Sequence, residues 1–518
     1  MRGAEALLRT LVDGGVDVCF TNPGTSEMQF VSALDRVPGM RAVLTLFEGV
    51  ATGAADGYAR MAERPAATLL HLGPGLANGI ANLHNARRAG VPLVNIVGEH
   101  AVTHMPFDAP LASDITGLAR AVSAWVRTTA HGGAIAGDTA AAIAAARQHP
   151  GQIATLITPA NVTWEECDGP APTSPVTTLP RASDRAVTAA AEALRSGEGS
   201  MILLGEKALY GRALELAGKI AAASGARLSG TTAFARQERG AGRVAPARVP
   251  YNVAEAIRFL APTRRLILVG STPPVGFFGY PGMPSLLIPP DAQILTLTRP
   301  GEDHVEALEH LADLLGAKGA APLQEAIVAP RPSGPLTLQV LAQTIAAAIP
   351  ANAILTDETV SGSFPTWYAS VGAQPHDWLP VTGGSIGNGM PLATGAAVAQ
   401  PDRPVLCLEA DGSAAYTLQA LWTQAREGLN VTTVIYHNRA YRILELEYRA
   451  TESGADPGPQ AAQLMRLDNP TLDWVSLARG MGVPANRATT AEELYSSLTN
   501  AMREPGPHLI EAYIVESR

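Results

Sequence analysis

The stretch from residue 405 to residue 438, VLCLEADGSAAYTLQALWTQAREGLNVTTVIYHN, constrains the fold more than any other part of the chain. It opens with the short apolar run Val405–Leu408, which is typical of a buried parallel strand. A helical pattern follows and ends at Gly428, and a β-branched strand runs over Val431–Tyr436. A right-handed crossover makes two such strands parallel. The sequence therefore predicts an α/β fold in which both strands end at the same edge of a sheet, where such folds bind ligands.

Oxygen-bearing groups follow both strands. Asp411 comes after the first strand, and Asn438 follows the second one, 27 positions later. The Asp carboxylate, the Asn carbonyl and the backbone carbonyl of Ala440 form an all-oxygen ligand set that suits Mg²⁺ held together with phosphate oxygens. Gly412 would let the backbone approach a ligand, and a helix beginning at Ser413 would offer free N–H groups to an anion. The pattern predicts a site for a magnesium-bound diphosphate, while an ordinary Asp-Gly turn is the simpler alternative.

Composition narrows the class of protein. A chain of 518 residues is too long for a single core, and two to four domains are expected. Hydrophobic residues make up 47% of the chain and charged residues 16%, which favours a large α/β enzyme with much interior or interface. The net charge of −9 disfavours nucleic acid as a partner. Three widely spaced cysteines indicate a reducing compartment, and no apolar run is long enough for a membrane span, so we expect a cytoplasmic protein.

Alternating helix and strand patterns divide the chain into three doubly wound α/β segments with parallel sheets, at residues 1–165, 183–320 and 336–518. Between them we expect two linkers, because residues 166–182 and 318–335 are rich in Pro, Thr or Gly and lack periodicity. In the first segment, a Gly-rich loop at residues 73–75 is predicted to precede a helix over residues 76–89.

With its spacing, the 405–438 stretch resembles the thiamine-diphosphate motif, in which Gly-Asp-Gly is followed at a similar distance by Asn. The family is the superfamily of thiamine-diphosphate-dependent decarboxylases and acetohydroxyacid (acetolactate) synthases, and the sequence looks most like its benzoylformate decarboxylases. One departure is Ala410, which stands where the motif has its first Gly. The resemblance covers essentially the whole chain. It implies an N-terminal pyrimidine-binding domain, a central Rossmann-like domain and a C-terminal domain that binds the diphosphate and Mg²⁺.

Glu48 lies in LTLFEGVATGAADGYARM, where a predicted strand meets a helix. A carboxylate at this position is either a helix N-terminal charge, worth about 0.3–1 kcal/mol, or a buried acid with a raised pKa that exchanges protons near neutral pH. The surrounding residues match the family motif around the glutamate that contacts the aminopyrimidine ring. The resemblance therefore implies that Glu48 activates the cofactor.

His71 ends a predicted strand and precedes the Gly-rich loop. A lone histidine there is more often a hydrogen-bonded polar residue than a catalyst, but ligands collect at this edge of a sheet. The matching position in benzoylformate decarboxylases is a catalytic histidine. Thr25 matches a serine that binds the substrate carboxylate, and its hydroxyl can donate one hydrogen bond. Capping of the helix expected near Glu27 is the alternative, and Ser26 is a rival for either role.

The stretch TGGSIGNG at residues 382–389 has neither a helical nor a strand period, which indicates backbone that approaches a ligand. By resemblance, Ile386 is the bulky residue under the cofactor, and the carbonyl of Gly384 receives its amino group. Ser361 and Tyr441 are further expected cofactor contacts. An ordinary Gly/Ser loop is the alternative for these positions.

The central segment departs from the benzoylformate decarboxylase pattern. Its loop TPPVGFFGYPGM at residues 272–283 carries Phe277, Phe278 and Tyr280 in place of a second active-site histidine. This puts benzoylformate in doubt as the substrate. His104 and Phe107 either line the pocket or are ordinary lid residues. Ile443, Leu444 and Glu447 are candidates to face the substrate, although the charges of RILELEYRA favour a solvated helix face.

The resemblance implies a thiamine-diphosphate- and Mg²⁺-dependent enzyme acting on a 2-keto acid, either a decarboxylase that releases an aldehyde or a carboligase of the acetolactate synthase type. It also implies a homodimer or homotetramer with active sites between subunits. A non-catalytic, cofactor-binding scaffold is the alternative from another class. Some members of the family bind FAD in the central domain, and nothing in residues 183–320 decides whether this chain does. Neither nucleic acid nor a membrane is an expected partner.

Overall fold

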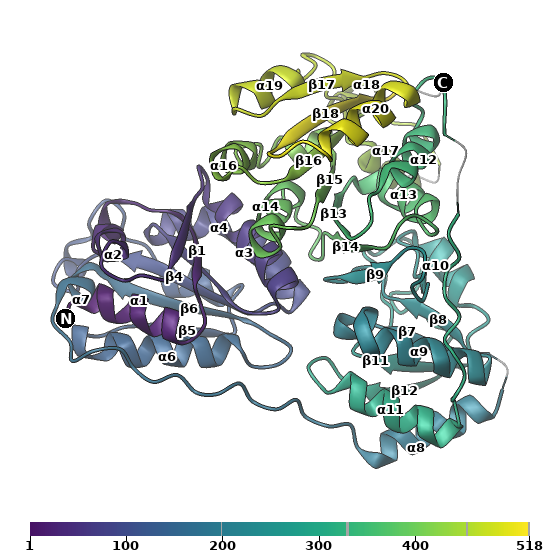
Figure 1. The fold of residues 1–518 in the computed structure, drawn as a ribbon, viewed down its shortest axis with the longest axis horizontal. Helices are drawn as coiled ribbons and strands as arrows, with labels where there is room; N and C mark the ends of the chain where they lie inside the picture. The colour runs from purple at the N-terminus through teal and green to yellow at the C-terminus, as the bar shows by residue number, and fades with distance from the viewer. Residues whose placement is uncertain (198, 328–330, 452–453, 516–518) are drawn as a thin grey trace.

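A computed structural model describes residues 1–197, 199–327, 331–451 and 454–515, and three β-sheets organise this part of the chain (Figure 1). Residues 198, 328–330, 452–453 and 516–518 belong to the second predicted segment, the second predicted linker and the third predicted segment, and they lie outside the described residues. In the described part of the chain, no helix is long and apolar enough to cross a membrane.

The first sheet has six parallel strands in the order β2-β1-β3-β4-β6-β5. The strands are β1 (Val18–Asn22), β2 (Arg41–Leu44), β3 (Ala66–Leu70), β4 (Leu93–Glu99), β5 (Trp125–Thr128) and β6 (Ile153–Pro159). The helices are α1 (Gly3–Asp13), α2 (Met28–Leu34), α3 (Glu48–Ala62), α4 (Leu72–Ala89), α5 (Ile115–Arg120), α6 (Ile135–Ala146) and α7 (Ala160–Trp164), with 3₁₀ turns η1 (Thr25–Glu27), η2 (Met105–Phe107) and η3 (Gly132–Ala134).

The second sheet has five parallel strands in the order β10-β8-β7-β11-β12. They are β7 (Ser200–Leu204), β8 (Arg227–Gly230), β10 (Ala247–Arg248), β11 (Arg265–Val269) and β12 (Gln293–Thr298). The helices are α8 (Asp184–Arg195), α9 (Gly211–Ser224), α10 (Val253–Leu260) and α11 (His304–Leu315), with the 3₁₀ turn η4 (Glu206–Leu209). Residues 169–183, which contain neither helix nor strand, lead into α8 along the lower side of the molecule in Figure 1.

The third sheet runs β17-β18-β16-β15-β13-β14-β9. Its parallel strands are β13 (Ala353–Glu358), β14 (His376–Pro380), β15 (Val405–Ala410), β16 (Val431–His437), β17 (Ala485–Ala488) and β18 (His508–Tyr513). The helices are α12 (Leu338–Ala348), α13 (Ser363–Ala369), α14 (Gly389–Ala399), α15 (Asp411–Ala414), α16 (Ala420–Glu427), α17 (Arg442–Thr451), α18 (Pro459–Gln463), α19 (Trp474–Gly480) and α20 (Ala491–Ala501), with the 3₁₀ turn η5 (Val360–Gly362).

The structure departs from the sequence expectations in three places. The predicted Gly-rich loop at residues 73–75 is the first turn of α4, which tolerates a proline because its early N–H groups need no intrahelical partner. The helix expected to begin at Ser413 begins at Asp411 and is only four residues long. The seventh strand of the third sheet, β9 (Gln237–Arg239), comes from the second predicted segment and pairs antiparallel with β14.

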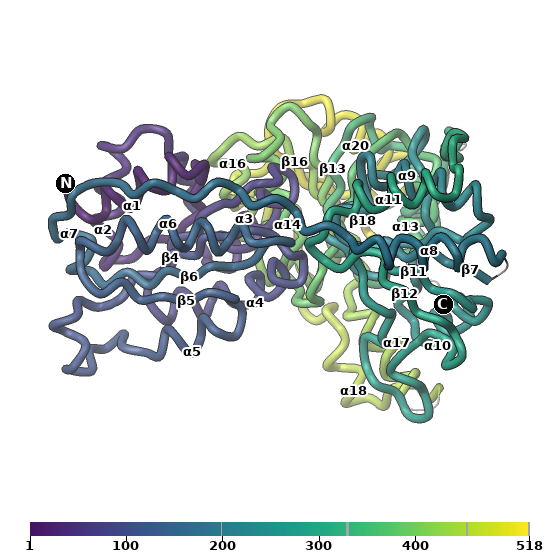
Figure 2. The backbone as a smooth tube through the Cα atoms, turned by 90° about the horizontal axis from the view of Figure 1, so that it is seen from below, coloured from purple at the N-terminus to yellow at the C-terminus, as the bar shows by residue number. Residues whose placement is uncertain are grey.

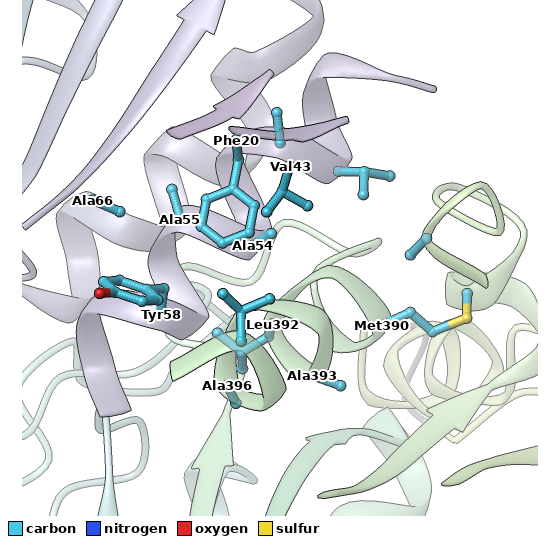
Figure 3. Packing of buried hydrophobic residues seen from close by; sticks show 14 of the residues in the cluster. Phe20, Val43, Ala54, Ala55, Tyr58, Ala66, Met390, Leu392, Ala393 and Ala396 are labelled. Atoms are coloured by element: carbon cyan, nitrogen blue, oxygen red, sulfur yellow. The ribbon is translucent and has the colours of Figure 1, made fainter. Parts of the chain in front are cut away.

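Helices α3 and α14 join the first sheet to the third, and Figure 2 places them between the two. Phe20, Ala54 and Tyr58 face Leu392 and other residues of α14 in one apolar cluster (Figure 3). The helices pack so closely that a Cβ added to Gly395 would lie 1.8 Å from the carbonyl oxygen of Ala54. This interface fixes the start of α3 relative to the loop that precedes α14.

Candidate active site

The ends of β15 and β16 bring together the residues predicted to hold a metal ion. The two strands are parallel neighbours in which Ala410 pairs with Tyr436, so the residues that follow them meet at one edge of the sheet. The Asp411 side chain is 1% exposed. Its carboxylate accepts hydrogen bonds from the backbone N–H groups of Gly412 at 2.9 Å and Arg439 at 2.6 Å. Asp411 therefore lies beside the turn after β16, as the spacing predicts.

This turn presents hard oxygen ligands. Asn438 Oδ1 accepts the backbone N–H of Ala440 at 2.9 Å, and Arg439 between them has a φ of 60°. Burial raises the pKa of Asp411, because the low-dielectric surroundings disfavour an uncompensated carboxylate. A divalent cation at this place would offset that cost, so the donor set fits Mg²⁺. In the described part of the chain, no three His, Cys, Asp or Glu side chains gather to hold a metal by themselves.

Gly412 and Ser413 also make local contacts within this turn. A Cβ on Gly412 would lie 2.5 Å from Cε1 of Tyr441, so the missing side chain makes room for the tyrosine ring. The Ser413 hydroxyl is buried and donates to the carboxylate of Glu409. Only its backbone N–H therefore remains for an anion, and Tyr441 covers the turn instead of a bare backbone.

Two buried glutamates lie behind this turn. Glu358, at the end of β13, accepts the backbone N–H groups of Gly387, Asn388 and Gly389 at 2.9, 2.8 and 2.7 Å. Burial raises the pKa of Glu358 and, still more, the pKa of Glu409, which also feels the negative charge of Glu358. Glu358 thereby ties the loop at residues 382–389 to the sheet edge that carries Asp411.

Helix α4, in the first segment, also binds the loop at residues 382–389. The side-chain amide of Asn85 donates to the carbonyl of Ser385 at 2.7 Å, and its oxygen accepts the N–H of Gly383 at 3.2 Å. Asn82 Nδ2 donates to the carbonyl oxygens of Gly49 and Gly387, at 2.8 and 3.0 Å. Neither asparagine was singled out from the sequence. Their side-chain amides connect the start of α3 with the loop predicted to lie under the cofactor.

The predicted cofactor contacts Gly384 and Ile386 lie on the loop before α14, and Ser361 lies in the 3₁₀ turn η5 after β13. Gly384 is exposed with a φ of 75°, and Ile386 is half-buried. Ser361 lies in η5, next to Val360, whose φ of 52° is unusual for a β-branched residue. Such backbone strain is often stored at ligand sites. These observations agree with cofactor binding, and the roles of the three residues stay predictions.

Glu48 is the first residue of α3 and is 9% exposed. Its Oε2 accepts a hydrogen bond from Asn78 Nδ2 at 3.0 Å, and Gly75 leaves space beside its Oε1. The carboxylate therefore lies at a helix N-terminus and is also buried, and its part in activating the cofactor stays a prediction. Asn78, on α4, was missed because nothing in the sequence indicates its contact with a residue 30 positions away.

His71 forms a hydrogen-bonded group with two residues of η1. Its Nδ1 lies 2.8 Å from Glu27 Oε2 and 3.2 Å from Ser26 Oγ, and Ser26 donates to the second oxygen of Glu27 at 2.5 Å. Glu27 is 4% exposed, and a Cβ on Gly98 would lie 1.7 Å from its Oε1. The chain therefore makes room for a buried carboxylate beside His71.

Thr25 is exposed, and among the described residues its hydroxyl makes no hydrogen bond and caps no helix. The alternative that Thr25 caps a helix is therefore wrong, and the binding role stays a prediction. Ser26, its rival, is the hydroxyl that contacts His71. Glu27 was missed as a partner of His71, although its position at the end of TNPGTSE, close to both hydroxyls, was a usable signal.

The loop at residues 272–283 of the second segment, which we call the aromatic loop, reaches this site. Cε1 of Phe277 is 3.3 Å from the place where a Cβ of Gly384 would stand. By contrast, Phe107 is 78% exposed on η2, and the ring of His104 contacts the ring of His100, with 5.5 Å between their centroids. Glu447, on α17, does not lie on a solvated helix face as its charge had indicated, because it accepts hydrogen bonds from Tyr251 and Tyr280.

Comparison with known proteins agrees with this geometry. Two family models match: the N-terminal binding domain of thiamine pyrophosphate enzymes over residues 1–117, and their C-terminal binding domain over residues 361–512. The first range contains Glu48 and His71, and the second contains Asp411 and Asn438.

Relatives match over nearly the whole length. A Mycobacterium tuberculosis protein, provisionally named acetolactate synthase large subunit IlvX, is 52% identical, with 99% of both chains covered. Benzoylformate decarboxylase of Pseudomonas aeruginosa is 30% identical, with 96% of both covered. The solved structure of a thiamine diphosphate-dependent 4-hydroxybenzoylformate decarboxylase from Rhodococcus jostii superimposes with a TM-score of 0.85, at 24% identity and 99% coverage of both chains.

Proposed function

The chain belongs to the thiamine pyrophosphate enzymes that act on 2-keto acids, and from this premise we propose that it is a Mg²⁺-dependent 2-keto acid decarboxylase. When bound, the thiamine diphosphate would supply the electron sink that makes loss of CO₂ feasible. Asp411, Asn438 and the carbonyl of Ala440 would hold the metal, and the turn at Gly412 and Ser413 would hold the diphosphate. The loop at residues 382–389 would support the rest of the cofactor.

Glu48 is the acid that exchanges a proton with the cofactor in this proposal. Its burial at the start of α3 keeps bulk water away from the carboxyl group, and Asn78 fixes the position of one oxygen at 3.0 Å. A carboxyl group held in this way can transfer a proton repeatedly in one geometry. The backbone of α3 is itself held against the third sheet through α14, so this geometry is built into the fold.

The observation that carries the decarboxylase proposal is the contact between His71 and Glu27. A histidine whose Nδ1 lies 2.8 Å from a buried carboxylate has a fixed ring orientation, as a proton-transfer residue requires. Decarboxylation to an aldehyde needs a proton donor after CO₂ leaves, and His71 is placed at the carboxyl edge of the first sheet to provide it. Thr25 or Ser26 would bind the carboxylate of the substrate.

A carboligase of the acetolactate synthase type is the second candidate. It is favoured by the 52% identity to the provisionally named acetolactate synthase IlvX. In this case a second carbonyl compound, in place of a proton, would react after CO₂ leaves. His71 would then be less important for turnover than Glu48.

The test is CO₂ release from a panel of aliphatic and aromatic 2-keto acids, with thiamine diphosphate and Mg²⁺ added. The products are analysed for aldehyde and for the joined hydroxy-ketone. Wild type is compared with Glu48→Gln and His71→Ala. The decarboxylase proposal expects aldehyde from wild type, none from Glu48→Gln, and a reduction of roughly 10²-fold or more in His71→Ala.

Other outcomes would point elsewhere. A hydroxy-ketone product with full activity in His71→Ala would favour the carboligase. Tight cofactor binding without turnover of any acid would overturn both and favour the scaffold. Thr103→Ala, in the loop before η2 and away from these contacts, is the matched control and should behave as wild type.

A further inference from the structure

A carboxylate on α17 joins the third segment to the second. Glu447 Oε1 accepts a hydrogen bond from the phenol of Tyr251 at 3.1 Å, and Oε2 accepts one from Tyr280 at 2.5 Å. Tyr251 immediately precedes the N-cap of α10, and Tyr280 lies in the aromatic loop. We call these three residues the tyrosine clamp. It uses both oxygens of one side chain to hold two elements that are 167 and 196 positions away in the sequence.

The tyrosine clamp adjoins the rings of Phe277 and Phe278, which we call the aromatic wall, beside the loop at residues 382–389. The ring centroids of Tyr251 and Phe277 are 5.2 Å apart, and those of Phe277 and Phe278 are 5.8 Å apart. Phe277 also lies against Gly384, as described above. Phe277 therefore contacts both the clamp and the loop predicted to lie under the cofactor. A shift of the clamp would displace the wall.

Helix α17 needs such a tether. None of its residues is buried, so packing alone does not fix it. The N-terminal end of α17 is connected to the turn at Gly412. The N–H of Leu444 donates to the carbonyl of Tyr441 at 2.9 Å, and the ring of Tyr441 covers Gly412. The helix also contacts η5, which carries Ser361. Glu447 is thus placed to control a helix that borders two predicted cofactor contacts.

We propose that Glu447 is a positioning residue, which through the tyrosine clamp holds α17 and the aromatic wall in the geometry that the 2-keto acid enters. This inference rests on the proposed function of the same site. Burial, together with the nearby Glu447 carboxylate, raises the pKa of Tyr251 and raises that of Tyr280 to about 12. Both phenols therefore stay protonated at neutral pH and remain hydrogen-bond donors.

The experiment compares Glu447→Leu, Glu447→Gln and the double variant Tyr251→Phe/Tyr280→Phe in the full-length protein. The matched control is Glu445→Gln, which removes a carboxylate that pairs with Arg442 on the same helix and contacts neither tyrosine. KM and kcat are measured with the best 2-keto acid, and thiamine diphosphate affinity is measured by fluorescence quenching. Amide hydrogen exchange of residues 442–451 is followed with and without cofactor.

Glu447→Leu and the double variant should raise KM by about tenfold, with a smaller effect on kcat, and should speed amide exchange in α17 by a similar factor. Glu447→Gln should stay within about threefold of wild type, because an amide oxygen still accepts phenol hydrogen bonds. KM and exchange rates in Glu447→Leu that match those of Glu445→Gln would overturn the proposal.

Failure of the proposed function has a different signature. If wild type turns over no 2-keto acid, the decarboxylase proposal fails, and the exchange data with bound thiamine diphosphate still decide whether the clamp holds α17. Equal exchange rates in wild type and the double variant would then reject the clamp on their own. A fall in thermal stability without any change in KM or exchange would show a merely structural contact.

Discussion

Nδ1 of His71 lies 2.8 Å from the carboxylate of Glu27, a residue 44 positions earlier that is 4% exposed. The same carboxylate accepts the N–H of Gly24 at 2.8 Å. A buried, hydrogen-bonded carboxylate cannot turn away, so the imidazole ring has one preferred orientation. The contact with Glu27 thus defines the orientation of the His71 ring, which its position at a strand end alone would not.

Replacing Glu27 by Ala should therefore lower kcat by roughly 10–10²-fold without weakening cofactor binding, because the imidazole loses its orienting partner but the cofactor loops are untouched. Steady-state kinetics with saturating thiamine diphosphate measure this. Ser26→Ala removes the 3.2 Å contact with His71 and the 2.5 Å hydrogen bond to Glu27 but leaves the carboxylate in place, so it should lower kcat less than Glu27→Ala does. If Ser26→Ala costs more than Glu27→Ala, the assigned order of the two contacts is wrong.

Asp411→Ala should abolish Mg²⁺-dependent binding of thiamine diphosphate, because it removes the only carboxylate predicted to bind the metal. Isothermal titration with and without Mg²⁺ measures the loss. Asn438→Ala removes a neutral oxygen and should weaken binding by roughly 10–10²-fold. Unchanged affinity in Asp411→Ala would contradict the metal site.

The pH dependence of unfolding should report His376, in β14. Its pKa is lowered to about 3, first by burial and then by the positive charge of Arg239. The unfolded chain protonates this residue near pH 6.5, whereas the folded chain resists protonation. Its contribution to stability is therefore complete above about pH 6.5 and is lost progressively as the pH falls toward 3, by up to roughly 1.4 kcal/mol per pH unit.

In His376→Gln this loss should be absent. Between pH 6.5 and 5 the midpoint of unfolding should therefore fall more in wild type than in the variant. Thermal unfolding monitored by circular dichroism over this range measures the gap. Two curves that stay parallel throughout would show that the histidine is protonated in the folded protein.

Gly395→Ala should lower the midpoint of thermal unfolding by several degrees, because a Cβ at this place would lie 1.8 Å from the backbone of α3. Gly480→Ala, in α19, adds a methyl group with no atom within 4 Å and should be neutral or slightly stabilising. Calorimetry on both variants measures the difference. Equal midpoints would mean that α3 and α14 can separate without cost.

The sequence predicted those parts of the site that depend on local spacing. Asp411 and Asn438 follow two strands joined by a helical connection, and a right-handed crossover leaves little freedom in where such strands end. The position of Glu48 at the start of a helix followed in the same way from a strand–helix junction. These are relations between neighbouring elements, for which short-range patterns are sufficient.

Relations between distant elements could not be predicted. Glu447 was expected on a solvated face because its tyrosine partners are 167 and 196 positions away. Glu409 lies in an otherwise apolar strand, and nothing local shows that Glu358, 51 positions earlier, is buried beside it. The predicted loop at residues 73–75 failed for another reason: proline and glycine usually break helices, but at a helix N-terminus their costs are small.

The strand β9 has a consequence for how this chain could be divided. It comes from the second segment yet completes the third sheet by pairing with β14, where Trp378 pairs with Gln237. Excision of the middle of the protein would leave the backbone groups on the β9 side of β14 unpaired, and such an exposed edge recruits other chains. The three sheets are therefore not interchangeable modules. Any shortened version of the protein would need a substitute strand at this edge to remain free of aggregation.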